Sequence, residues 1–317
     1  MTVRPTTPFH IPPEILALSQ ERDELRRKGK YDRADELKRR IEEAGYGIKD
    51  NPRGAHLIIL PRVEIDGTLY GTTRQVPSLL DAADSCTFSV NVLAGDELEQ
   101  TRRCIESVFR FAGAHMIEVV LVNDAVSEEV DAWASTFRAG EPRLHLVSLT
   151  RKIGQAEARN LALKRSQGRY ILVLNNRVEL VGDLFRPLAD TLANSEIGVT
   201  GLHGLVTSDM RHFEESGEPE AEVIDAMVMA FRRNLLKRCG MFDERYRYPD
   251  YMDIDFSFSI RDCGKRAVVT PDLPVQCAPE VGDDRLSEAE RNRLNRRNYY
   301  RFLDKWGHRE DLLLDFE

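Results

Sequence analysis

The sequence has few cysteines, and their spacing does not suit a metal site. The five thiols, Cys86, Cys104, Cys239, Cys263 and Cys277, are scattered, odd in number and never in a C-x-x-C arrangement. Zinc sites use closely spaced pairs, and the disulfide frameworks of small secreted proteins use even numbers of cysteines. We therefore expect free thiols in a reducing compartment and no structural zinc.

Long apolar runs are missing as well. No stretch approaches the roughly 20 residues that a membrane-spanning helix needs. The first residues, "MTVRPTTPFHIPP", lack the apolar core of a signal peptide. These absences predict a cytoplasmic protein without a transmembrane segment, for which a peripheral membrane contact stays open.

The chain also lacks an excess of positive charge. Its 45 Lys and Arg residues are outnumbered by 53 Asp and Glu residues, and the formal net charge is -8. Because such a chain does not attract phosphate backbones over its whole surface, nucleic acid is not an expected partner. With 317 residues, 42% of them hydrophobic, the chain can form one large domain and a small one.

The glycine-rich signatures of two common nucleotide sites are absent. "VLAGDELE", after the first apolar run of the main domain, has one glycine and no G-x-G-x-x-G pattern. The sequence contains no G-x-x-x-x-G-K-[ST] loop either. These absences exclude a dinucleotide-binding dehydrogenase and a P-loop NTPase.

From about residue 85, strand-like apolar runs alternate with helix-like runs. The expected strands are residues 86–94, 117–124, 143–149 and 169–176, and the expected helices are residues 97–112, 127–137 and 154–166. Alternation at these lengths is typical of βαβ units. The predicted fold class is α/β, with a Rossmann-like, mainly parallel sheet and helices on both faces, which suits a nucleotide-handling domain.

The other segments divide the chain into four expected parts. Residues 1–60 have apolar positions at helical spacing and predict a small N-terminal helical hairpin with a short strand. Residues 61–84 are rich in turn-forming residues and predict a linker. Residues 85–280 form the expected α/β domain, and residues 281–317 predict a C-terminal helix packed on it.

Polar residues stand where the predicted strands end. Asp124 follows "VVLVN", and Asn175, Asn176 and Arg177 follow "YILVL". In open α/β sheets, ligands bind at the carboxyl ends of the strands. We therefore expect the site at this edge of the sheet.

Four motifs in order resemble those of the family 2 glycosyltransferases. They are "VLVNDAVSEE", "IGQAEARNLALKRSQGRYILVLNN", the stretch from "VIDAMVMAFRR" to "GMFDERYRYPDYMDIDFSFSIRDCGKR", and "FLDKWG". The resemblance covers residues 87–307, about 220 of the 317 residues. It implies a GT-A fold and an inverting transfer of a sugar from a nucleoside-diphosphate sugar to a glycan or other hydroxyl acceptor.

The resemblance also implies roles for individual residues. Asp124 would contact the base of the donor nucleotide, and Arg159 and Asn160 would line or brace the donor pocket. Asp253 would be the general base, with Asp255 beside it in the donor site. Such a transfer needs a carboxylate that takes the acceptor's proton and a group that stabilises the departing diphosphate.

The chain departs from the family at the motif that binds a metal. The final carboxylate of D-x-D holds Mg or Mn in most members, but the motif reads Asn175, Asn176 and Arg177 here. Met252 replaces the glutamate of E-D-x-D, and Cys277 stands where a histidine is frequent. We therefore expect Asn175 and Asn176 at the donor but no metal ligand, which makes a divalent metal a doubtful cofactor.

Two functional interpretations stay open. The planar fork of arginine suits phosphate, so Arg177 could stabilise the diphosphate in place of the metal while Asp253 acts as catalytic base. Alternatively, the domain has kept its fold and lost catalysis, and is a pseudoenzyme with a binding or scaffold role. Structural roles are also available, as helix caps for Asp124 and Asp253 and as ion pairs for Arg159 and Arg177.

The N-terminal hairpin resembles other families. "RDELRRKGKYDRADELKRRIEEAGYGIKDNPRGAHL" is similar to the C-terminal tail of cysteinyl-tRNA synthetases and, almost as closely, to the UvrB-type interaction hairpin. Association with tRNA or a synthetase is therefore one interpretation, and a packing or protein-interaction appendage is the other. The sugar, the nucleoside, the acceptor and the oligomeric state depend on loop conformations that residue types do not reveal.

Overall fold

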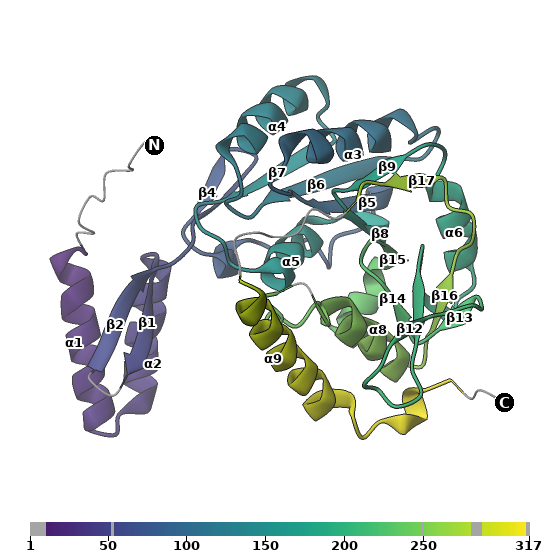
Figure 1. Cartoon of the computed structure of the whole chain (residues 1–317). Helices are drawn as coiled ribbons and strands as arrows, with labels where there is room; N and C mark the ends of the chain where they lie inside the picture. The colour runs from purple at the N-terminus through teal and green to yellow at the C-terminus, as the bar shows by residue number, and fades with distance from the viewer. Residues whose placement is uncertain (1–10, 52–53, 249, 280–286, 315–317) are drawn as a thin grey trace. The chain divides into compact units, whose positions relative to one another are not determined.

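The chain forms two compact units in a computed structural model that describes residues 11–51, 54–248, 250–279 and 287–314. The first unit comprises residues 1–63 and 68–76, and the second comprises residues 64–67 and 77–317. Figure 1 shows the helices and strands of both.

The first unit is a helical hairpin with a small sheet. Its helices α1 (Pro13–Arg27) and α2 (Tyr31–Glu43) are followed by β1 (Tyr46–Asn51) and β2 (Gly54–Ile59), which pair antiparallel. The helices turn at Gly29, whose φ of 69° favours glycine. A buried arginine, Arg22, donates to both carboxylate oxygens of Asp50 at 2.5 and 2.9 Å, which ties α1 to β1. The resemblance of this hairpin to a synthetase tail stays a prediction.

The segment expected as a linker, residues 61–84, contains regular structure. Strands β3 (Val63–Ile65) and β4 (Thr68–Tyr70) precede a short 3-10 helix, η1 (Thr73–Gln75). Asp66 belongs to the second unit, where its N–H donates to Leu146 at 3.1 Å.

The second unit is built on one large, mainly parallel sheet, and this confirms the predicted fold class. The strands run in the order β13-β16-β10-β15-β8-β5-β6-β7-β3. Its parallel centre comprises β5 (Cys86–Leu93), β6 (Ile117–Asn123), β7 (Leu144–Leu149) and β8 (Gly168–Asn175). The other strands are β10 (Ile197–Gly201), β13 (Glu220–Ala221), β15 (Val228–Arg232) and β16 (Arg266–Val269), of which β15 runs antiparallel to both neighbours.

Helices cover both faces of this sheet (Figure 1). Along β8, Leu172 and Leu174 face one core and Ile171 and Val173 face the other, as alternation in a strand requires. The first core includes residues of α3 (Leu98–Arg110), α4 (Glu128–Gly140) and α6 (Phe185–Ala193). The second includes residues of α5 (Gln155–Arg165), α7 (Leu236–Cys239) and α8 (Met252–Asp262).

The remaining elements are short, apart from the last helix. They are β9 (Val178–Leu180) paired with β17 (Val275–Cys277), the sheet of β11 (Gly204–Val206), β12 (Glu214–Glu215) and β14 (Val223–Ile224), and the 3-10 helices η2 (Arg233–Leu235) and η3 (Glu310–Leu312). Helix α9 (Glu288–Trp306) begins with a capping box between Ser287 and Glu290. Among the described residues, no helix combines the length and the apolar composition that a bilayer would require.

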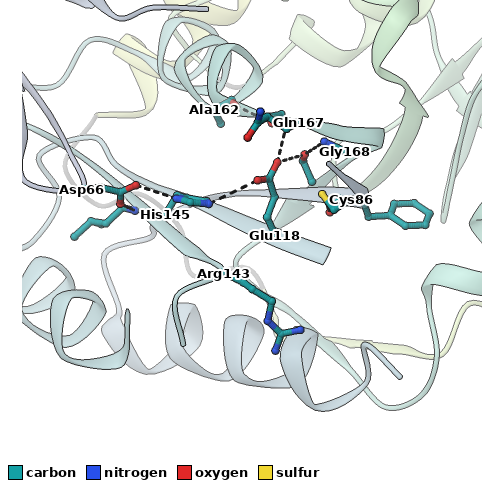
Figure 2. A network of polar contacts seen from close by, with 12 residues as sticks. Asp66, Cys86, Glu118, Arg143, His145, Ala162, Gln167 and Gly168 are labelled. Atoms are coloured by element: carbon teal, nitrogen blue, oxygen red, sulfur yellow. Dashed lines mark hydrogen bonds and ion pairs between the residues drawn. The ribbon is translucent and has the colours of Figure 1, made fainter. Parts of the chain in front are cut away.

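A closed polar network lies at the amino ends of the parallel strands (Figure 2). Glu118 accepts hydrogen bonds from Ser89 Oγ at 2.5 Å and from the N–H of Gln167 at 2.6 Å. Its other oxygen faces His145 Nε2 at 3.6 Å, and His145 Nδ1 lies 2.9 Å from Asp66. We call Asp66, Ser89, Glu118, His145 and Gln167 the amino-end network.

Each charged end of this network has a partner. Asp66 also accepts from the N–H of Leu146 at 3.0 Å and pairs with Arg138 at 3.3 Å. Burial opposes ionisation of Asp66, but the hydrogen bonds from His145 and Leu146 lower its pKa below the ordinary value. The bond to Asp66 likewise raises the pKa of His145.

Candidate active site

A cavity of about 820 Å³ lies at the carboxyl end of β8. It is lined by Gln155 and Arg159 of α5, by the turn after β8, by the loops around Arg211 and Asp225, by the start of α8 and by one face of α9. Five predicted site residues line it: Arg159, Asn175, Asn176, Arg177 and Asp253. The other three predicted residues, Asp124, Asn160 and Asp255, do not.

Arg159 is the most unusual side chain of the cavity. It is only 5% exposed, and its Nε and Nη1 atoms have no hydrogen-bond partner among the described residues. Burial lowers its pKa to about 10, although the charge of Asp253 opposes that shift. Because a buried cation with unpaired donors is unfavourable, this side chain suits an anionic ligand.

The turn after β8 brings Asn175, Asn176 and Arg177 into the cavity wall. Asn175 Oδ1 accepts from the N–H of Arg177 at 3.0 Å, which shapes the turn, and Arg177 Nη1 donates to the carbonyl of Ala278 at 3.3 Å. A Cβ on Gly95 would lie 2.3 Å from Asn176 Nδ2, so only glycine lets that amide lie so close. The turn therefore presents two amides and a guanidinium to the cavity.

Asp253 is the second residue of α8 and is partly buried. Its Oδ2 accepts from the N–H of Ala226 at 3.0 Å and its Oδ1 from the N–H of Ile254 at 2.9 Å. Burial raises its pKa to about 6, and the nearby charge of Asp225 adds to the shift while the backbone bonds oppose it. A carboxylate with such a pKa is an effective general base near neutral pH.

Asp225 is a second carboxylate of the cavity, and the sequence analysis missed it. It follows β14, lies 3.2 Å from His203 Nδ1 and accepts from the N–H of Met227 at 3.1 Å. Burial raises its pKa. An aspartate inside the apolar run "VIDAMVMAF" is a signal that could have identified it, because a buried strand rarely contains an isolated charge.

Asp124 orders the approach to α5. Its two oxygens accept from the N–H groups of Ile153 at 2.8 Å and Gly154 at 3.2 Å, and burial raises its pKa to about 6. Gly154, with φ of 107°, directly precedes the helix. Ser127, not Asp124, caps α4. The predicted contact of Asp124 with a nucleotide base stays a prediction.

Asn160 and Asp255 do not line the cavity, and their side chains bond to other parts of the second unit. Asn160 exchanges hydrogen bonds with the backbone of Phe242 at 2.9 and 3.1 Å. Asp255 is 2% exposed and accepts from Lys305 Nζ at 2.9 Å and from Trp306 Nε1 at 2.8 Å, which fixes the end of α9. Their contacts with the donor stay predictions, and their present partners give both a structural role.

The fold of the second unit is the GT-A fold of glycosyltransferases. Within that class, the chain belongs to glycosyl transferase family 2, whose family model matches residues 89–248. The resemblance noted in the motifs is thereby confirmed.

A curated relative and several solved structures are similar to the chain. "Succinoglycan biosynthesis protein ExoO" of Rhizobium meliloti (strain 1021) is 29% identical over 217 residues, which are 62% of this chain and 61% of the relative. The match thus spans about three fifths of that relative's length.

The solved structures support the fold. GalNAc-T7 with UDP, GalNAc and Mn2+ has a TM-score of 0.57 at 14% identity, over 71% of this chain and 50% of that chain. Mannosyltransferase PcManGT from Pyrobaculum calidifontis, in complex with GDP-Man and Mn2+, has a TM-score of 0.50 at 20% identity, over 66% of this chain and 61% of that chain. S. aureus TarS 1-349 in complex with UDP-GlcNAc has a TM-score of 0.50 at 17% identity, over 73% of this chain and 68% of that chain.

Proposed function

We propose that this chain transfers a sugar, with inversion, from a nucleoside-diphosphate sugar to a hydroxyl acceptor. The observation that carries this proposal is Arg159, whose buried, unpaired donors line the same cavity as the carboxylate of Asp253. An anion-binding group and a base in one cavity are the two parts that such a transfer needs.

The donor's diphosphate would lie between Arg159 and Arg177. Both line the cavity at the carboxyl end of β8, and α5 begins there at Gln155, so the positive end of its dipole adds to the field. Negative charge grows on the diphosphate as the bond to the sugar breaks. Two guanidinium groups held in advance would stabilise that charge most in the transition state.

Asp253 would take the proton from the acceptor hydroxyl. The oxygen of that hydroxyl attacks the anomeric carbon as the nucleoside diphosphate leaves from the opposite side, which inverts the configuration. The N–H groups of Ala226 and Ile254 orient the carboxylate. Its raised pKa keeps it basic enough to accept a proton in the transition state.

A divalent metal does not fit the described residues well. No group of three or more His, Cys, Asp or Glu side chains in this part of the chain is placed to hold a metal ion. The turn after β8 presents two amides and a cation, and a guanidinium repels a metal. We therefore include metal independence in the proposal and derive no step through a metal.

The comparisons do not favour the alternative, a catalytically silent scaffold. A cytoplasmic location and a separate binding role for the N-terminal hairpin also remain expectations. Association with tRNA through the hairpin predicts salt-sensitive binding that is lost on deletion of residues 1–60.

The first test is a thermal-shift screen of UDP-, GDP- and dTDP-sugars, each with manganese and with EDTA. We expect one nucleotide to raise the melting temperature in both conditions, because a ligand of the folded state stabilises it. Arg177→Ala should remove the shift, whereas Arg186→Ala, a matched change at an exposed arginine of α6, should keep it. No shift with any donor, from a folded sample, would favour the scaffold interpretation.

A further inference from the structure

We infer that the α9 side of the cavity is an acceptor subsite for a sugar that carries a carboxylate or phosphate group, held by Arg211, Asn295 and Arg296. This inference rests on the proposed function, in which the donor's diphosphate lies between Arg159 and Arg177. It assigns the rest of the cavity to the acceptor. All three residues line the cavity together with Asp253. The acceptor's hydroxyl and its anionic group would thus bind within one enclosure.

An aromatic cluster holds this side of the cavity in place. Phe213 packs edge-on against Phe258 of α8 and Phe302 of α9, with ring centroids 6.4 and 5.7 Å apart. Tyr251 lies 6.0 Å from Tyr299 and 5.7 Å from Phe302. The Arg211 loop, the start of α8 and α9 are therefore held together by one set of aromatic contacts, in which Phe258 and Phe302 are buried.

The backbone of Arg211 is fixed on both sides. The preceding residue, Met210, is only 2% exposed and has φ of 56°, and Phe213 belongs to the aromatic cluster. Asp209 Oδ1 accepts from the N–H groups of Arg211 and His212, both at 2.8 Å. A long cationic side chain on so constrained a turn is presented to a ligand at low cost in backbone entropy.

The charges of Arg211 and Arg296 are not neutralised by ion pairs within the described part of the chain. The chain as a whole has a formal charge of -8, so two such cations in one cavity are not a general feature of its surface. Asp250 also lines this side, and its carbonyl accepts from Asn298 at 2.9 Å. Arginine recognises carboxylates and phosphates through paired hydrogen bonds, which makes either group a suitable ligand.

Asn295 provides a separate observation. Its Oδ1 atom is buried and has no hydrogen-bond partner among the described residues, although the residue lines the cavity. On α9, Tyr299 lies four residues after Asn295 and three after Arg296, so it neighbours both of them on the helix surface. An unpaired buried acceptor calls for a donor, and a sugar hydroxyl supplies one.

The test compares two sugars that differ only at C6. We would titrate 4-nitrophenyl β-D-glucuronide and 4-nitrophenyl β-D-glucoside by calorimetry, with and without the nucleotide that stabilises the protein. The glucuronide should bind about tenfold more tightly, in keeping with a charged hydrogen-bonded pair. Glucose 6-phosphate against glucose gives the corresponding comparison for phosphate, and the larger preference identifies the anion.

Variants assign the preference to residues. Arg211→Gln and Arg296→Gln should each reduce the preference for the charged sugar, and Arg293→Gln, an exposed neighbour on α9 outside the cavity, should not. Asn295→Ala should weaken the binding of both sugars of a pair equally, because Asn295 would contact a hydroxyl that both sugars have. Equal binding of charged and neutral sugars, or a preference unchanged in both arginine variants, would overturn the inference.

Failure of this inference and failure of the proposed function are distinguishable. If the proposed function fails, no nucleotide sugar binds, yet the charged sugar is still preferred when the titration is done without nucleotide. If only the inference fails, the nucleotide shift and its loss in Arg177→Ala remain, while the two sugars bind alike.

Discussion

The two ends of the same parallel strands differ in how fully their buried charged groups are paired. At the amino ends, Glu118, His145 and Asp66 form a network in which each charged group has partners. At the carboxyl ends, Arg159 is as buried as Glu118 but keeps two donors unpaired among the described residues. A satisfied polar network contributes rigidity, whereas an unsatisfied one indicates a place that a ligand completes.

The largest expected effect separates chemistry from binding at the carboxyl ends. Asp253→Asn keeps the size of the side chain and loses one of its two backbone hydrogen bonds, but it cannot accept a proton, so transfer or donor hydrolysis should fall about 100- to 10,000-fold. The thermal shift given by the nucleotide should stay within a few degrees of the wild type. Kinetics and thermal shift on the same sample check this, and a variant with full activity would remove Asp253 from the mechanism.

The next effect belongs to the amino-end network. Glu118→Ala removes the acceptor of Ser89, Gln167 and His145, and leaving buried donors unpaired costs about 1–3 kcal/mol. Urea denaturation should show this loss of stability, while nucleotide binding to the folded variant should not change. Glu99→Ala, at an exposed site on α3, is the matched control.

Arg159→Met, at the carboxyl ends, should give the reverse of the Glu118→Ala result: stability is kept and nucleotide binding is weakened. Because the guanidinium is buried with unpaired donors, its replacement by an apolar side chain of similar length should leave stability unchanged or raise it. Nucleotide affinity should fall about tenfold or more, since charged hydrogen bonds to the diphosphate are lost. A large loss of stability with unchanged affinity would mean that the two ends do not differ as described.

Local patterns predicted the parallel centre of the sheet, but not the contacts that complete the site. The apolar runs predicted β5 to β8, the strand end pointed to Arg177, and Arg159 and Asp253 came from the family resemblance. Asp255 could not be interpreted alone, because Lys305 and Trp306 lie about 50 residues further along the chain. Arg211 and Asn295 carry no local signal, since their role depends on aromatic packing between separate elements.

The smallest expected effect is a pH dependence of stability with opposite signs at the two ends. The pKa of His145 is raised in the fold, so its contribution is full below its ordinary value near 6.5 and is lost as the pH rises through the folded value. The pKa of Asp66 is lowered in the fold, so Asp66 stabilises the folded chain at pH values above its ordinary pKa near 3.8. This stabilisation is lost as the pH falls through the folded pKa. The amino-end network therefore stabilises most between pH of about 4 and 6.5.

Asp124 and Asp253 at the carboxyl ends behave in the opposite way. Burial raises the pKa of each to about 6, so ionising them in the folded chain is unfavourable, and stability falls as the pH rises from about 4 to 6. Because His145 is partly exposed, the effect of its ionisation should stay at about 1 kcal/mol, a shift of about 2–4 °C in melting temperature.

Melting curves of two variants across pH separate these contributions. His145→Gln should lower the melting temperature more at about pH 5.5 than at about pH 8.5, because only the protonated imidazole bridges the two carboxylates. The melting temperature of Asp253→Asn, relative to that of the wild type, should increase as the pH rises from about 4 to 7, because the neutral amide avoids a buried charge. If both variants gave curves parallel to that of the wild type, neither His145 nor Asp253 would have a pKa shifted by folding, and the contrast between a closed network and an open site would not extend to electrostatics.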